Sequence, residues 1–310
     1  MRRAGDVVKR LAPFLVMLAG CLWATLSLFV RHFNDVGLTS MEILEARNIL
    51  SAAALFLFLG LFRRELLRVR AKDLWCFAGG GIGSVILFNY CYFQTIQRSS
   101  LSVAAILLYT SPIFVLLLSV PLFGEKLTKK KVFCLIMAFT GCALAGGLAS
   151  DGMNLSWVTL LLGLGSGFGY GLYSIFSRYA LQRGYHPMTI TAYILLFASV
   201  GGIPLTDFSQ LSGAVQRDGG LLWYLMVFTL VATILPNAFY ITGLRYVENG
   251  VAAVLACIEP AMATIFGIFV FSELPTPAGW AGIFLVLAAL VLLNLQPKNL
   301  MTRNKSKEFL

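Results

Sequence analysis

The sequence predicts an all-α integral membrane protein whose ten transmembrane helices form two inverted five-helix repeats. Three observations predict this fold class. Of the 310 residues, 58% are hydrophobic and only 12% are charged, whereas soluble domains are about 45–50% apolar and about 25% charged. The chain divides into ten long apolar runs, and the second half of the chain echoes the first.

The ten apolar runs are each long enough to cross a bilayer, which takes about 20 residues. They are also too long, and too poor in alternation, for barrel strands of about 9–11 residues. The predicted helices are 11–31, 40–62, 74–96, 101–123, 131–149, 157–179, 187–205, 220–244, 250–272 and 277–296.

The basic segment Met1–Arg10 precedes an apolar run that continues to about Val30. That run is too long for a signal peptide and no small-residue cleavage site follows it, so we expect an uncleaved first helix. The predicted organisation is a tail (1–10), a first repeat (11–149), a linker (150–156), a second repeat (157–296) and a basic tail (297–310).

The orientation follows from the basic residues, which concentrate in cytoplasmic loops. If the N-terminus is cytoplasmic, 20 of the 24 lysines and arginines fall on the cytoplasmic side, three fall outside, and Arg47 lies within the second helix. We therefore expect both termini to be cytoplasmic and the protein to be a multi-pass protein of the inner or plasma membrane.

Several functional classes are excluded by composition and motifs. The net charge of +10 comes from loops and tails rather than from a nucleic-acid-binding face. The six cysteines lie inside apolar runs without a CxxC pair, and the two histidines are far apart, so neither a disulfide framework nor a metal site is expected. No cofactor, Walker or hydrolase motif is present, so we expect no enzyme.

The internal repeat has an offset of 147–148 residues. The stretch 103–107 (VAAIL) matches 251–255 (VAAVL), and the repeat-related pairs include Pro112/Pro260, Glu125/Glu273, Asn89/Asn237, Tyr92/Tyr240 and Trp23/Tyr170. Because each half holds an odd number of helices, the second copy enters from the opposite side. Inverted repeats are typical of transporters, with the binding site near the midplane between them.

These residues resemble a known family. Trp23 after Gly20, Arg47 within helix 2, Ser111-Pro112 before Gly124-Glu125, and Glu259-Pro260 before the 272–274 segment SEL resemble the ten-helix EamA-type branch of the drug/metabolite transporter superfamily. The resemblance covers nearly the whole chain. It implies a central cavity, helices 5 and 10 at the periphery where a homodimer would form, and transport of amino acids and related metabolites, mostly by export.

Glu259 is the strongest candidate for a substrate-binding residue. A carboxylate at this depth costs about 2.5–3.5 kcal/mol, so it usually faces a cavity or a partner. We expect Pro112 and Pro260 to interrupt their helices and to free backbone groups beside the site. Glu259 either binds a substrate amine or carries a proton, or it braces the fold.

Arg47 either holds a substrate carboxylate or pairs with Glu42, Glu45 or Glu259. Glu42 and Glu45 form either a solvated interfacial pair or an outer vestibule that attracts cations. Asn89 and Asn237 either line the cavity or hold helices together. Trp23, Tyr109 and Tyr240 lie near the middle of their runs and either line the cavity or pack in the core. Glu125 and Glu273 are interpreted either as interfacial gate or cap residues or as interfacial residues without a function.

The sequence thus predicts a secondary transporter of a small organic metabolite such as an amino acid. It would work by alternating access around a midplane cavity, as an exporter, with either proton coupling or facilitated diffusion. The alternatives are a non-catalytic membrane receptor or assembly subunit and a lipid-handling membrane protein. The short loops disfavour a receptor.

Overall fold

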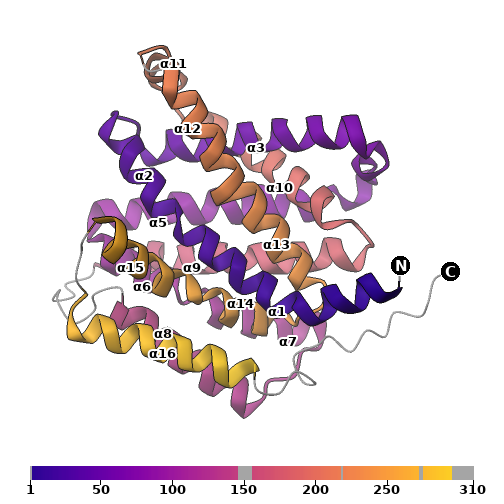
Figure 1. Ribbon diagram of the computed structural model, residues 1–310, viewed down its shortest axis with the longest axis vertical. Helices are drawn as coiled ribbons and strands as arrows, with labels where there is room; N and C mark the ends of the chain where they lie inside the picture. Colours follow the sequence, from indigo (N-terminus) through magenta and orange to yellow (C-terminus); the bar gives the residue numbers. More distant parts are fainter. Residues whose placement is uncertain (1, 146–155, 218, 272–274, 295–310) are drawn as a thin grey trace.

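The computed structural model describes residues 2–145, 156–217, 219–271 and 275–294, and its elements are helices that run side by side in one bundle (Figure 1). The first half contains α1 (Arg2–Ala24), α2 (Leu26–Asp35), α3 (Ser40–Phe62), η1 (Arg64–Leu67), η2 (Ala71–Asp73), α4 (Leu74–Ala78), η3 (Gly79–Ile86), α5 (Leu87–Arg98), α6 (Leu101–Leu108), α7 (Ser111–Phe123) and α8 (Lys129–Ala145). The second half contains α9 (Trp157–Gln182), α10 (Pro187–Gly202), η4 (Ile203–Leu205), α11 (Phe208–Arg217), α12 (Gly219–Thr229), η5 (Leu230–Ile234), α13 (Leu235–Leu244), α14 (Asn249–Ala256), α15 (Ile258–Phe271) and α16 (Pro277–Asn294).

The predicted fold class is confirmed. Within the described residues, eight continuous helical segments are long and apolar enough to cross a membrane, and α16 supplies a shorter apolar helix. The fifth predicted helix, 131–149, corresponds to α8, and its expected continuation at 146–149 lies outside the described residues. Large apolar side chains are exposed on the outside of the bundle, such as Phe269 at 82% and Phe284 at 73%. Such a surface suits contact with lipid rather than water.

The connection between the seventh and eighth spans contains a helix that the sequence did not predict. α11 occupies residues of the predicted loop 206–219, and its Ala214 is buried. Ala214 and Leu211 pack with Phe33, in the last turn of α2, and with Leu38, which follows that helix. Burial of this apolar face explains why a segment that reads as a loop folds into a helix.

The helix contacts have the symmetry that two repeats require. α1 packs against α13, and its counterpart α9 packs against α5. α1 also packs against α14 and α15, as α9 does against α6 and α7. Two further major contacts, α3 with α10 and α8 with α16, map onto themselves when the repeats are exchanged. These interfaces are therefore shared by the two halves of the bundle.

Two of the spans are interrupted at repeat-related positions. α6 gives way to α7 at Tyr109 and Thr110, and α14 gives way to α15 at Cys257. Pro112 and Pro260 lie in the first turns of α7 and α15, where a missing N–H is tolerated. At the first interruption the Thr110 hydroxyl donates to the Leu107 carbonyl (2.6 Å). The first span is also interrupted, at Thr25.

The third and eighth spans each contain a stretch of π-helix, and these stretches end at the repeat-related residues Ile86 and Ile234. The η3 stretch is rich in glycine because α9 and α10 approach it closely. A Cβ on Gly81 would lie 2.5 Å from the Ile194 carbonyl oxygen and 2.6 Å from the Ala198 nitrogen, and backbone atoms cannot move aside. The glycines here serve close helix packing.

The substitution Gly81→Ala tests this packing. We expect it to lower the apparent melting temperature of the detergent-purified protein, because overpacking costs about 1–3 kcal/mol. Gly83→Ala is the matched control, since a Cβ on Gly83 has only one neighbour, at 3.9 Å. A Gly81→Ala protein as stable as Gly83→Ala would contradict the close approach of α10 to η3.

Candidate functional site

Glu259 occupies the first turn of α15, immediately after the interruption at Cys257. Its carboxylate accepts a hydrogen bond from the Tyr170 hydroxyl of α9 (3.0 Å). Tyr92 of α5 and Tyr109, at the other interruption, are close enough for electrostatic interaction with the same carboxylate. Three tyrosines from three spans thus surround one half-buried carboxylate inside the bundle.

Further aromatic side chains extend this cluster. The Trp23 ring lies 6.3 Å from the Tyr170 ring, edge-on, and 5.3 Å from the Tyr240 ring, measured between centroids. The Tyr240 hydroxyl shares a hydrogen bond of 2.5 Å with the Ser174 hydroxyl. The Tyr173 ring lies 6.0 Å from that of Tyr240. The cluster combines one carboxylate with several aromatic faces, and both groups attract cations.

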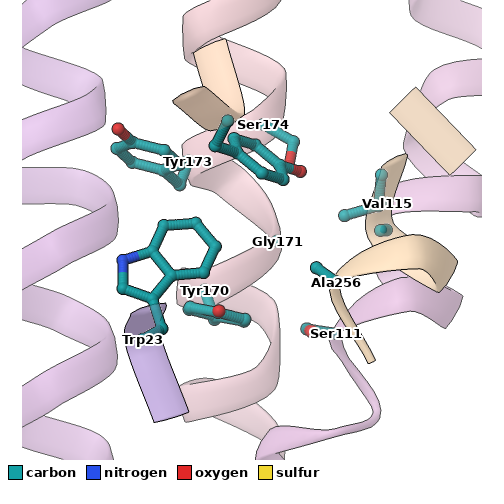
Figure 2. A pocket seen from close by; sticks show the side chains of 10 residues that line it. Trp23, Ser111, Val115, Tyr170, Gly171, Tyr173, Ser174 and Ala256 are labelled. Atoms are coloured by element: carbon teal, nitrogen blue, oxygen red, sulfur yellow. The ribbon is translucent and has the colours of Figure 1, made fainter. Parts of the chain in front are cut away.

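A small cavity lies beside these rings. Figure 2 shows Trp23, Tyr170 and Tyr173 on one side and Ser111, Val115 and Ala256 on the other. Ser111 directly follows the first helix interruption, and Ala256 directly precedes the second, so the cavity lies between the two breaks. About 20 Å³ is free, which is room for one or two water molecules. A metabolite needs this cavity to widen.

A buried polar cluster closes one end of the bundle, where α7 ends and α14 begins. The two Glu125 carboxylate oxygens accept hydrogen bonds from the backbone nitrogens of Asn249 (2.5 Å) and Gly250 (3.1 Å), and so cap α14. Arg178 of α9 donates to the Asn249 side chain (2.6 Å) and to the Val247 carbonyl. The cluster joins the two repeats.

Lys131 of α8 extends this Glu125 cluster. Its ammonium group pairs with Glu248 and donates to the Lys126 carbonyl (2.9 Å). Burial raises the pKa of the Glu125 carboxyl, while the two backbone N–H groups favour its ionised form. Because these groups are buried, the cluster is held by charge-assisted hydrogen bonds rather than by a solvated surface pair.

The profile of the EamA-like transporter family matches residues 10–147 and again residues 157–295. The chain belongs to the EamA-like transporter family. The two matched segments correspond to the two halves whose helix contacts exchange in the structure.

Curated relatives of this EamA-like transporter cover most of its length. An uncharacterized transporter of Archaeoglobus fulgidus is 28% identical over 89% of this chain and 94% of its own. The uncharacterized inner membrane transporter YicL of Salmonella typhimurium is 21% identical over 91% of this chain and 95% of its own. The pseudopaline exporter CntI of Pseudomonas aeruginosa is 26% identical over 67% of this chain and 71% of its own. A crystal structure with 18% identity has a TM-score of 0.75 and covers 92% of this chain and 96% of its own, which supports the fold.

Two of the predicted site residues, Trp23 and Tyr240, line the cavity of this EamA-like transporter. Glu259 is joined to the cavity-lining Tyr170 by a hydrogen bond, and Tyr109 lies close to Glu259. Asn89 is buried, but its amide donates to the Val85 carbonyl of its own span (2.7 Å). Asn237, in α13, is half-buried and makes no hydrogen bond with another described side chain.

The structure does not bring Arg47 to this cavity. Its guanidinium lies 6.0 Å from the centre of the Phe228 ring, and its buried Nε has no hydrogen-bond partner among the described residues. None of the ion pairs between described residues joins Arg47 to Glu42, Glu45 or Glu259. The predicted pairing with these glutamates is therefore absent from this conformation.

The interpretation of Glu42 and Glu45 as a solvated pair is wrong, because their exposed fractions are 2% and 1%. Glu42 forms a capping box with Thr39 at the start of α3, in which the Thr39 nitrogen donates to the carboxylate (2.8 Å). Glu45, one turn further along α3, lies against Gly202 of α10. Glu273, interpreted with Glu125 as a gate or cap residue, lies outside the described residues.

Sequence reasoning did not select Tyr92, Tyr170 and Ser174 as site residues. The repeat held a usable signal, because Trp23/Tyr170 and Tyr92/Tyr240 are repeat-related pairs. Inverted repeats place such pairs symmetrically about the midplane. A cavity residue in one half therefore predicts that its repeat-related partner in the other half lies near the cavity as well.

Glu125→Gln tests the polar cluster in a variant that retains Cys257 as its single cysteine. Cys257 is only 3% exposed in this closed form. Because a hydrogen bond to a charged group is worth about 1.5–3 kcal/mol, we expect Cys257 to be alkylated by a maleimide about tenfold faster in detergent. Glu65→Gln is the control, since Glu65 is exposed and pairs only with Arg63. An unchanged rate in Glu125→Gln would show that the cluster does not hold this end closed.

Proposed function

We propose that this protein is a secondary transporter that exports a small organic metabolite with a cationic amine, such as an amino acid. The observation that carries the proposal is Glu259 among tyrosines: its partner Tyr170 lines a cavity between two repeat-related helix breaks. Membership of a transporter family agrees with it. A carboxylate at such depth is costly unless it serves a cavity or a partner.

Recognition rests on the carboxylate and the aromatic rings. Glu259 binds the substrate ammonium group, and the Tyr170 hydroxyl orients the carboxylate. The rings of Trp23 and Tyr240 attract the same cation and pack on the apolar part of the substrate. The interrupted spans leave backbone groups beside the cavity, as broken helices do in other transporters.

Alternating access follows from the inverted repeats. With both termini cytoplasmic, as the distribution of basic residues favours, the Glu125 cluster lies at the cytoplasmic end and closes it. When the two repeats exchange their packing arrangements, this end opens and the opposite end closes around the same cavity.

Export is the favoured direction because CntI, a relative, is named an exporter. The inner or plasma membrane is the proposed location, in line with the relative YicL. The chain carries no Walker motif, so we propose that a gradient drives transport rather than ATP, and that the protein catalyses no reaction.

A thermal-shift screen with the protein amino acids, one at a time, tests the substrate class. We expect at least one to raise the melting temperature, because a ligand of the native state stabilises it. Glu259→Gln should weaken the apparent affinity about 10- to 100-fold, since a charged hydrogen bond is worth about 1.5–3 kcal/mol. Tyr170→Phe should weaken it several-fold.

Tyr90→Phe is the matched control for Tyr170→Phe, because Tyr90 is 45% exposed on the outside of α5. It should leave the thermal shift unchanged. If Glu259→Gln binds the same amino acid as tightly as the wild type, Glu259 is not the amine-binding group. If no amino acid or related amine stabilises the wild type or crosses a vesicle membrane with it, a receptor or assembly role gains support.

A further inference from the structure

A stripe of polar side chains on α3 plays no part in the cavity. Glu45, Asn48 and Ser51 recur every three residues and therefore lie along one side of the helix. Their exposed fractions are 1%, 1% and 0%. Both Glu45 oxygens, both polar atoms of the Asn48 amide and the Ser51 hydroxyl lack a hydrogen-bond partner among the described residues.

Glu45 lies where the two repeats meet. A Cβ on Gly202, the last residue of α10, would lie 1.9 Å from the Glu45 Oε2 atom, so the carboxyl group packs directly on the backbone of α10. α3 belongs to the first repeat and α10 to the second. Asn48 is close enough for electrostatic interaction with Glu45 but forms no hydrogen bond of ordinary geometry with it.

Among the side chains that the structure describes, no charged group compensates Glu45. On its own helix, Glu42 is engaged by Thr39 and Arg47 lies over Phe228. Ionisable side chains also occur on the elements that pack against α3, and none of those described forms a hydrogen bond or ion pair with Glu45: Tyr193 on α10, Tyr224 on α12, His32 and Asp35 on α2, Tyr90, Cys91, Tyr92 and Arg98 on α5, Arg64 and Glu65 on η1, and Arg217 on α11.

A carboxylate in these surroundings needs a cation. An ionised carboxylate without a donor is disfavoured strongly in an apolar interior. A sodium ion would need space and several oxygen ligands, whereas Oε2 already touches the α10 backbone. A proton forms an O–H bond on the carboxylate itself and needs no cavity.

We propose that Glu45 is a proton-binding site of the transporter, separate from Glu259, and that this proton is the coupled ion. The inference rests on the proposed transport function. When α3 and α10 pack as they do here, the carboxyl group is protonated. Glu45 lies about 8 Å along α3 from its first residue, so separation of the two helices at that end admits water. The O–H bond then breaks, the proton passes to water, and a hydrated carboxylate remains.

Infrared spectroscopy of the purified wild type at neutral pH tests the site without a substrate. We expect a C=O stretching band of a protonated carboxylic acid that weakens in Glu45→Gln. Glu45→Gln is close in shape to the neutral acid, so it should fold. Glu42→Gln is the matched control one turn away and should leave the band unchanged. Equal bands in Glu45→Gln and the wild type would overturn the proposal.

Transport in proteoliposomes tests the coupling, with a tritium-labelled mixture of the protein amino acids as the probe. We expect the wild type to move label against its gradient when a pH gradient is imposed. Glu45→Gln should lose this uphill transport but keep exchange of label across the membrane at a pH-independent rate. Replacement of sodium by potassium in the buffers should leave the transport rates of both proteins unchanged.

The outcomes separate the two proposals. If the wild type moves no label while its infrared band depends on Glu45, the proposed substrate class fails and the proton site stands. If Glu45→Gln drives uphill transport as the wild type does, the coupling inference fails and the transport function stands. Uphill transport that depends on sodium and on Glu45 would overturn the assignment of the proton.

Discussion

A carboxylate held inside a membrane-spanning bundle is the constraint on which the rest of this structure depends. Glu259 has to be kept away from lipid, because a charge at that depth costs about 2.5–3.5 kcal/mol. The break at Cys257 places it in the first turn of α15, and Tyr170 of α9 reaches it from the neighbouring span. Gly20 lets α1 pass so closely that an added Cβ would lie 2.6 Å from the Ile258 side chain.

Glu125, Glu259 and Glu45 differ in the hydrogen bonds that their carboxylates receive. Glu125 uses both oxygens to cap α14 and joins the two repeats at one end. Glu259 has a single donor, Tyr170, and keeps capacity for a further partner beside the cavity. Glu45 has no hydrogen-bond donor within the described part of the chain and packs on the α10 backbone. The number of donors that each carboxylate receives is thus the basis for the three roles that we propose: structural for Glu125, substrate-binding for Glu259 and proton-binding for Glu45.

Much of the architecture is predictable from sequence because the bilayer restricts the choices. Apolar length gives the spans, and the fixed offset between Pro112 and Pro260 gives two related halves. Glu259, Trp23 and Tyr240 are predictable because polar or aromatic groups in mid-run need a special environment. Tyr170 and Tyr92 cannot be identified in the same way, because a tyrosine in an apolar run is equally consistent with packing in the core.

Other features depend on rotation about the helix axis, which apolar runs do not fix. Arg47 and Glu45 are two residues apart and so point in different directions, toward Phe228 and toward Gly202. The helical fold of 208–217 was missed because its apolar face becomes evident only when Phe33 and Leu38 are placed beside it. Tertiary contacts decide such cases.

Reciprocal movement of the two ends is the central claim, and pulsed electron resonance between spin labels measures it most directly. One pair would be placed at Leu127 and Arg245, beside the Glu125 cluster. The other would be placed at Leu101, which begins α6, and Phe269, near the end of α15; all four residues are exposed. In lipid nanodiscs with the amino-acid mixture, the account predicts a state in which the first distance lengthens while the second shortens. Distances that stay fixed, or that lengthen together, would contradict it.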